Sequence, residues 1–267
     1  MVAGERDELF TAAAYKLLFA ELNPKIAVSV EPALGHMDMI ADPRGTAAVA
    51  AAWRRLAEAG RVRQAERFDM KVREDMFAGF DGDETAFARA MALVERTLAQ
   101  NPDHAEALTW RGGARLFQAG QAFGRKAFAE GMRLQAEGLA DLERGVALEP
   151  NSPGTRALRG PVLMIYAAGL RPHDRALADR LTTTGIGDFE FMVAREHPRW
   201  PGLAAHDRGE LLGGLAAGWL QLDEPVKAAP YLERMIAELP NTPYAKAAAE
   251  RRADPRSKAA LTCLGCH

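Results

Sequence analysis

Four turns built around proline constrain the fold of this chain more than any other feature. The segments AQNPDHAEAL, ALEPNSPGTR, REHPRWPGLA and AELPNTPYAK each follow one helical pattern and precede another, and their first prolines are Pro102, Pro150, Pro198 and Pro240. Proline can end one helix and is tolerated at the start of the next. The spacings of 48, 48 and 42 residues approach a fixed period, which is typical of a solenoid of helical hairpins. We therefore predict an all-α fold built as a helical-hairpin repeat array.

Over residues 84–253 the chain resembles the tetratricopeptide repeat family. The second helix of that repeat carries small and large apolar residues in a fixed order before the proline, and the matching positions here are Ala90, Val94, Thr97 and Leu98, then Ala228, Leu232, Met235 and Ile236. The family also has a glycine where the two helices of a repeat cross, and Gly112 and Gly160 stand at that place. The resemblance implies stacked hairpins. Their helices must be longer, or carry insertions, because the family's period is 34 residues.

The last six residues, TCLGCH, contain both cysteines of the chain, Cys263 and Cys266, followed by His267. Cys-x-x-Cys-His is the spacing of c-type haem attachment. Two thiols at this separation can add across the two vinyl groups of a haem, and the adjacent histidine then lies under the iron as its proximal ligand. The tail resembles the haem-binding motif of c-type cytochromes. This resemblance implies one covalent haem c, held by these three residues and attached outside the cytoplasm after export.

Three other interpretations of the tail stay open. A redox-active dithiol is one, although such motifs usually open a helix in a βαβ context, which this sequence lacks. A zinc site is another; the tail offers three ligands, and a further histidine or a second copy of the chain would supply the fourth. The third is an inert tail.

The first 45 residues differ from the array. We expect a helix over 5–21 and an irregular apolar segment over 22–45, with 26–30 as the best strand candidate. A loop of that length usually has a task. His36 stands in it beside Met37 and Met39, and histidine and methionine are the usual second axial ligands of electron-transfer haems. We predict His36 as the distal iron ligand, with Met37 or Met39 as alternatives.

The other histidines stand near turns or helix starts, where a surface or capping role is the commoner one. They are the next candidates for the iron if the 22–45 segment supplies no ligand: His104, His173, His197 and His206. The expected organisation is an N-terminal helix plus irregular segment over 1–45, a helical-repeat array over 46–253 and a haem-attachment tail over 254–267. We expect the array, not the tail, to hold the fold, so that deletion of residues 256–267 should leave helix content and cooperative unfolding largely intact.

The net charge of the chain limits the kinds of partner that it is expected to bind. A net charge of -2 gives no electrostatic reason to expect a nucleic acid or an anionic membrane. The longest uncharged run, 211–222, is too short to span a bilayer. The acidic residues are expected on solvated helix faces. The start, MVAGERDELF, carries charges where a secretory signal has its apolar stretch. We therefore expect either a cytoplasmic chain or a numbering that begins after a removed signal.

The sequence thus favours an exported monohaem c-type cytochrome on a helical-repeat scaffold, periplasmic or extracellular, acting in electron transfer or as a haem-bearing assembly protein rather than as a catalyst. Its expected partners are a redox protein and further copies of itself, arranged head to tail, because a haem on a tail must be covered by the 22–45 segment or by a neighbour. The alternative is a cytoplasmic interaction scaffold whose Cys/His tail binds zinc or nothing. A haem enzyme with an open iron site, such as a peroxidase, ranks last.

Overall fold

The computed structural model describes residues 2–7, 12, 14, 17–18 and 28–262. The chain divides into two compact units, Met1–Met70 and Lys71–His267. We call them the N-terminal unit and the helical unit and describe each by itself. The boundary falls later than the expected division at residue 45, because the first long helix of the presumed array packs on the N-terminal strand and on a short helix instead.

The N-terminal unit is built around two short parallel strands, β1 (Val2–Gly4) and β2 (Ser29–Glu31), with Val2 opposite Ser29. A turn, the short helix α2 (Asp38–Ala41) and the long helix α3 (Pro43–Glu66) follow. Leu34 is buried against this framework. The strand candidate at 26–30 overlaps β2, and the expected helix over 5–21 lies mostly outside the described residues. The segment expected to be irregular is therefore folded from residue 28 onward.

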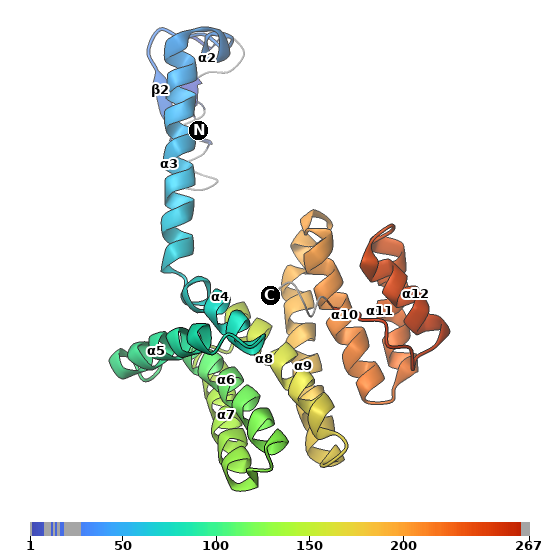
Figure 1. Cartoon of the computed structure of the whole chain (residues 1–267). Coiled ribbons are helices and arrows are strands. Elements are labelled where there is room, and N and C mark those ends of the chain that lie inside the picture. The colour runs from blue at the N-terminus through green and yellow to red at the C-terminus, as the bar shows by residue number, and fades with distance from the viewer. Residues whose placement is uncertain (1, 8–11, 13, 15–16, 19–27, 263–267) are drawn as a thin grey trace. The chain divides into compact units, whose positions relative to one another are not determined.

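The described residues of the helical unit form helices joined by turns, with no strand among them, and end in the non-helical segment 254–262 (Figure 1). Its elements, the first of which begins at the boundary between the units, are α4 (Phe68–Phe80), α5 (Glu84–Gln100), α6 (Ala105–Gly124), α7 (Phe128–Leu148), α8 (Pro153–Leu170), α9 (Arg175–Glu196), the 3-10 turn η1 (His197–Gly202), α10 (Ala205–Gln221), α11 (Pro225–Glu238) and α12 (Pro243–Ala253). Each of the four proline turns separates two helices, as the sequence predicts. The all-α helical fold is thereby confirmed.

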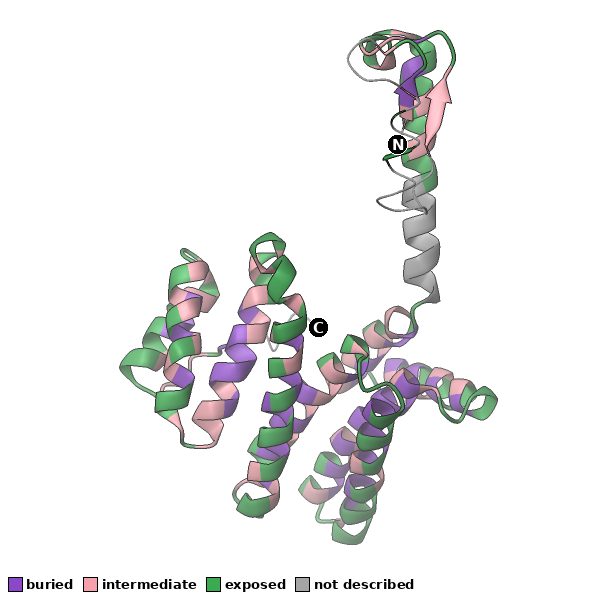
Figure 2. Ribbon diagram, turned by 180° about the vertical axis from the view of Figure 1, so that it is seen from behind, coloured by how far each residue is buried: buried purple, intermediate pink, exposed green. Residues whose placement is uncertain are grey.

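Consecutive helices pair as antiparallel hairpins, α6 with α7, α8 with α9, and α10 with α11, and α12 then packs on α11. Buried residues follow the sides of these helices that face one another (Figure 2). The predicted core positions Val94, Leu98, Leu232 and Met235 are all buried. The apolar register read from the sequence is therefore confirmed at these positions.

Two hairpins repeat the same internal contacts. Gly112 of α6 meets Gly138 of α7 so closely that a Cβ on either glycine would lie within 3.0 Å of the other residue's carbonyl oxygen. Gly160 of α8 and Gly185 of α9 form the corresponding crossing in the next hairpin. The prediction that Gly112 and Gly160 mark helix crossings is confirmed, because only glycine allows two backbones this close an approach.

Each of these hairpins also buries one aspartate beside its glycine crossing. Asp141 accepts hydrogen bonds from Arg111 and Arg115, and Asp188 accepts them from Arg156 and Arg159, at distances of 2.6 to 2.8 Å. The expectation that acidic residues lie on solvated faces is wrong for these two. A buried carboxylate is tolerated here because two guanidinium groups pair with it.

Candidate functional site

The residues of the predicted haem-attachment motif, Cys263, Cys266 and His267, lie outside the described residues. The segment that leads into them, 254–262, is described and lies on the helical unit. Arg251 of α12 holds its backbone: Nε donates to the carbonyl of Ala259 at 2.9 Å and Nη1 to that of Pro255 at 3.2 Å.

Leu261 is the point at which this segment enters the core. Its side chain is 3% exposed and belongs to the apolar cluster formed by α10, α11 and α12. Its carbonyl lies against Gly213 of α10, where any Cβ would overlap it, and Thr262 Cγ2 would be 3.3 Å from that Cβ. Residues 254–262 therefore pack on the helical unit through Leu261, and the expectation that deletion of 256–267 leaves the fold largely intact stays a prediction. Gly213 leaves the space that the segment needs to lie flat on α10.

His206 stands on the same helix as Gly213. From the sequence it is expected to have a surface or capping role. Its Nδ1 lies 2.7 Å from the hydroxyl of Tyr244, the second residue of α12, and that hydroxyl donates a hydrogen bond to Glu210 Oε1 at 2.8 Å. The ring of Tyr244 packs against Gly209, which fixes the start of α12 beside the start of α10. The spacing of His206, Glu210 and Gly213 puts all three on one helix face. This spacing can be read from the sequence. The contact with Tyr244 joins residues 38 positions apart, so no local sequence pattern predicts it.

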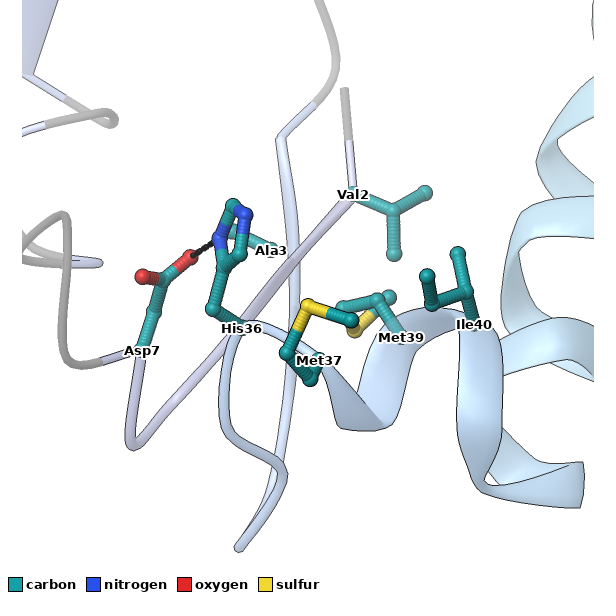
Figure 3. A pocket seen from close by; sticks show the side chains of 7 residues that line it. All are labelled: Val2, Ala3, Asp7, His36, Met37, Met39 and Ile40. Atoms are coloured by element: carbon teal, nitrogen blue, oxygen red, sulfur yellow. Dashed lines mark hydrogen bonds and ion pairs between the residues drawn. The ribbon is translucent and has the colours of Figure 1, made fainter.

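The predicted distal ligand, His36, lies in the N-terminal unit. It lines a pocket of about 220 Å³ together with Val2, Ala3, Asp7, Met37, Met39 and Ile40 (Figure 3). His36 Nδ1 lies 3.1 Å from Asp7 Oδ2, and the Asp7 side chain is only 5% exposed. An ionised carboxylate only accepts hydrogen bonds, so Nδ1 is the donor where it pairs with ionised Asp7. The structure brings His36, Met37 and Met39 together in one pocket, and the assignment of His36 to the iron stays a prediction.

The remaining histidines have separate positions in the helical unit. His104 is the N-cap of α6, and its Nδ1 accepts a hydrogen bond from the amide of Ala107 at 3.2 Å, which confirms a capping role. His173 is exposed in the turn between α8 and α9, and His197 is exposed at the start of η1.

Over residues 2–7, 12, 14, 17–18, 28–55 and 67–262, whose side chains are described, no three His, Cys, Asp or Glu side chains gather as a metal site would require. Within the same residues, no helix is long and apolar enough to cross a membrane. Comparison with protein-family models, with curated proteins and with solved structures finds no match for the chain.

Proposed function

We propose that this protein is an exported monohaem c-type cytochrome on a helical-repeat scaffold, acting in electron transfer or as a haem-bearing assembly protein. The observation that carries the proposal is the motif CLGCH, which contains the only two cysteines of the chain. Cys263 and Cys266 would form the thioethers and His267 would be the proximal iron ligand. When bound, haem c supplies one-electron redox chemistry.

The anchored segment before the motif supports this proposal. A single residue, Thr262, separates the buried Leu261 from Cys263. Consecutive Cα atoms are 3.8 Å apart, so the Cα of Cys263 lies within about 7.6 Å of the Cα of Leu261. A group attached there would therefore be held close to α10 rather than carried on a long tether. Such an anchor suits a redox centre, because it limits how far the attached group can move from the helical unit.

The surfaces of the two units suit the partners that the proposal requires. Stacked hairpins form extended binding faces, which the helical unit would offer to a redox partner protein. The N-terminal unit exposes large apolar side chains at Met37, Ile40, Val49 and Trp53. Val49 and Trp53 are four residues apart on α3 and share a face. Exposed apolar side chains of this size are characteristic of interaction sites, and a neighbouring copy in a homo-oligomer would cover them.

Expression with an added export signal, in cells that contain the haem-attachment machinery, tests the proposal. Because thioethers survive denaturation, the purified protein should keep its haem after denaturing electrophoresis and acid-acetone extraction, at one haem per chain. Cys263→Ala and Cys266→Ala should each leave at most one thioether, and the double variant should lose the colour on extraction. The protein without the export signal should stay colourless, since the proposal requires attachment outside the cytoplasm.

A wild-type protein that acquires no covalent haem under these conditions would defeat the proposal. Zinc at one equivalent per haem-free chain would then favour the alternative, a cytoplasmic interaction scaffold with a zinc-binding tail. Zinc should in that case disappear in the Cys263→Ala variant.

A further inference from the structure

We propose that Met37 and Met39 form a binding site for the soft metal ion Cu(I) in the pocket of the N-terminal unit. The proposal needs no haem and no residue of the C-terminal motif, so it stands apart from the proposed function. It gives the two thioether groups a metal other than the haem iron, for which the sequence predicts them only as alternative ligands.

The exposure of the two methionines is the first argument. Methionines of a protein core are flexible side chains that fill gaps between their neighbours, and that role requires burial. Met37 is 58% exposed and Met39 is partly exposed. The buried apolar residue of this segment is Leu34, at 2% exposed. Core packing therefore does not account for the two methionines at positions 37 and 39.

The second argument is that both thioethers line one pocket. Its volume is about 220 Å³, and in the view of Figure 3 the two side chains lie between His36 and Ile40, with Val2 of β1 beside them. Residues two apart on a helix do not face each other. Met37 is the residue before α2 and Met39 is the second residue of α2, and their flexible side chains allow both to line the pocket.

The backbone that carries the two methionines is held by its neighbours. The amide of Gly35 donates a hydrogen bond to Asp38 Oδ2 at 2.7 Å. The amide of Ile40 donates to the carbonyl of Met37 at 3.2 Å. A Cβ at Gly45 of α3 would lie 2.3 Å from the carbonyl oxygen of Asp38, so α3 packs directly on α2. Rotation of the two side chains alone would therefore adjust the sulfur atoms to an ion.

The choice of ion follows from the donor atoms. A thioether is an uncharged, polarisable sulfur, and soft ligands of this kind select Cu(I). Carboxylates, carbonyls and water suit Mg²⁺, Ca²⁺ and Mn²⁺ instead. His36 and Asp7 also line the pocket and pair with each other at 3.1 Å, and we assign neither of them as a ligand.

The first experiment titrates the full-length protein with Ag(I), a soft ion that stays monovalent in air, and follows ¹³C-labelled methionine methyl groups by NMR. An ion bound to sulfur shifts the resonance of the attached methyl group. Once the cysteines are saturated, the signals of Met37 and Met39 should shift together and reach a plateau at one further ion per chain. Met132, 57% exposed on α7, is the matched control and should not shift over that range. No shift at Met37 and Met39, or an equal shift at Met132, would overturn the proposal.

The second experiment counts bound Cu(I) by anaerobic titration against a chromophoric chelator, in the wild-type protein and in Met37→Leu, Met39→Leu and Met132→Leu. Leucine has a similar volume and no sulfur, so the fold should be kept while the donor is removed. The cysteines contribute equally to all four proteins. The wild-type protein and Met132→Leu should bind one Cu(I) more per chain than the other two.

Equal counts in all four proteins would refute the site. A wild-type protein that acquires no covalent haem would remove the proposed function and leave these two titrations unaffected. The failure of one proposal is therefore distinguishable from the failure of the other.

Discussion

The contact between Gly213 and the segment 254–262 predicts how Gly213→Ala changes the stability of the protein. The sign of that change depends on whether the segment is present. The three atoms nearest to a Cβ at Gly213 belong to Leu261 and Thr262. Gly213→Ala in the full-length protein should therefore push this segment off α10. In a chain shortened to residues 1–253, the same substitution places its Cβ in the space that the segment vacated. There it should only improve the helix propensity.

The magnitudes follow from the burial of Leu261. Displacing a leucine that is 3% exposed costs about 1.5–3 kcal/mol of burial free energy. Replacing glycine by alanine inside a helix gains about 1 kcal/mol. We expect Gly213→Ala to lower the free energy of unfolding of the full-length protein by about 0.5–2 kcal/mol and to raise that of the shortened chain by about 1 kcal/mol.

Urea-induced unfolding, followed by far-ultraviolet circular dichroism, measures all of these changes. Gly187→Ala is the matched control, because Gly187 is an exposed residue inside α9 whose added Cβ would meet no neighbouring atom within 4 Å. It should stabilise both chain lengths by about 1 kcal/mol. If Gly213→Ala stabilises the full-length protein as much as the shortened one, Leu261 does not lie on Gly213, and the anchoring argument fails.

Three further substitutions test the core of the helical unit. Leu232→Ala should lower the free energy of unfolding by about 2–5 kcal/mol, measured in the same urea titration. Val226→Ala is the control, because Val226 is 83% exposed on the same helix, and it should change that free energy by less than about 0.5 kcal/mol. Asp188→Ala removes the carboxylate that pairs with two arginines and should lower the free energy of unfolding by about 3–5 kcal/mol, measured by thermal or urea unfolding. Arg89→Ala breaks an exposed ion pair and should lower it by only about 0–1 kcal/mol. Burial raises the pKa of Tyr166 from 10.0 to about 12, so the unfolded chain loses this proton first and stability should fall as pH rises between these values. Tyr166→Phe should cost about 1–2 kcal/mol at neutral pH, because Gln135 loses its donor, and should remove that part of the alkaline decline.

The parts of the fold that depend on local signals could be predicted from the sequence. A proline turn is visible because proline restricts its own residue and its neighbours, and the core position Leu232 is visible because apolar residues recur with the helical period. Gly112 could be assigned to a helix crossing by its distance from Pro102. In each case the physical cause lies within one turn or one helix.

The parts that depend on contacts between distant segments could not be predicted. Asp141 and Asp188 resemble any other acidic residue of a helix until the folded hairpin brings two arginines to each of them. β1 is only three residues long and exists because β2 pairs with it across 27 positions. Leu261 belongs to the core only because Gly213 leaves room for its backbone. The contact of Tyr244 with His206 was hidden for the same reason, because it joins residues 38 positions apart.

The source of the second axial ligand determines how the spectrum of the proposed haem should depend on protein concentration. If the same chain supplies that ligand, the effective concentration of the ligand at the iron is set by the length of the connecting chain. Dilution across a thousandfold range should then leave the low-spin ferric spectrum unchanged, even where size-exclusion chromatography shows that an oligomer dissociates. A ligand from a neighbouring copy would instead be lost on dilution, and the high-spin fraction would rise together with the fraction of monomer. Parallel curves of this kind would show that a neighbouring chain completes the iron site, and they would refute a second ligand from the same chain.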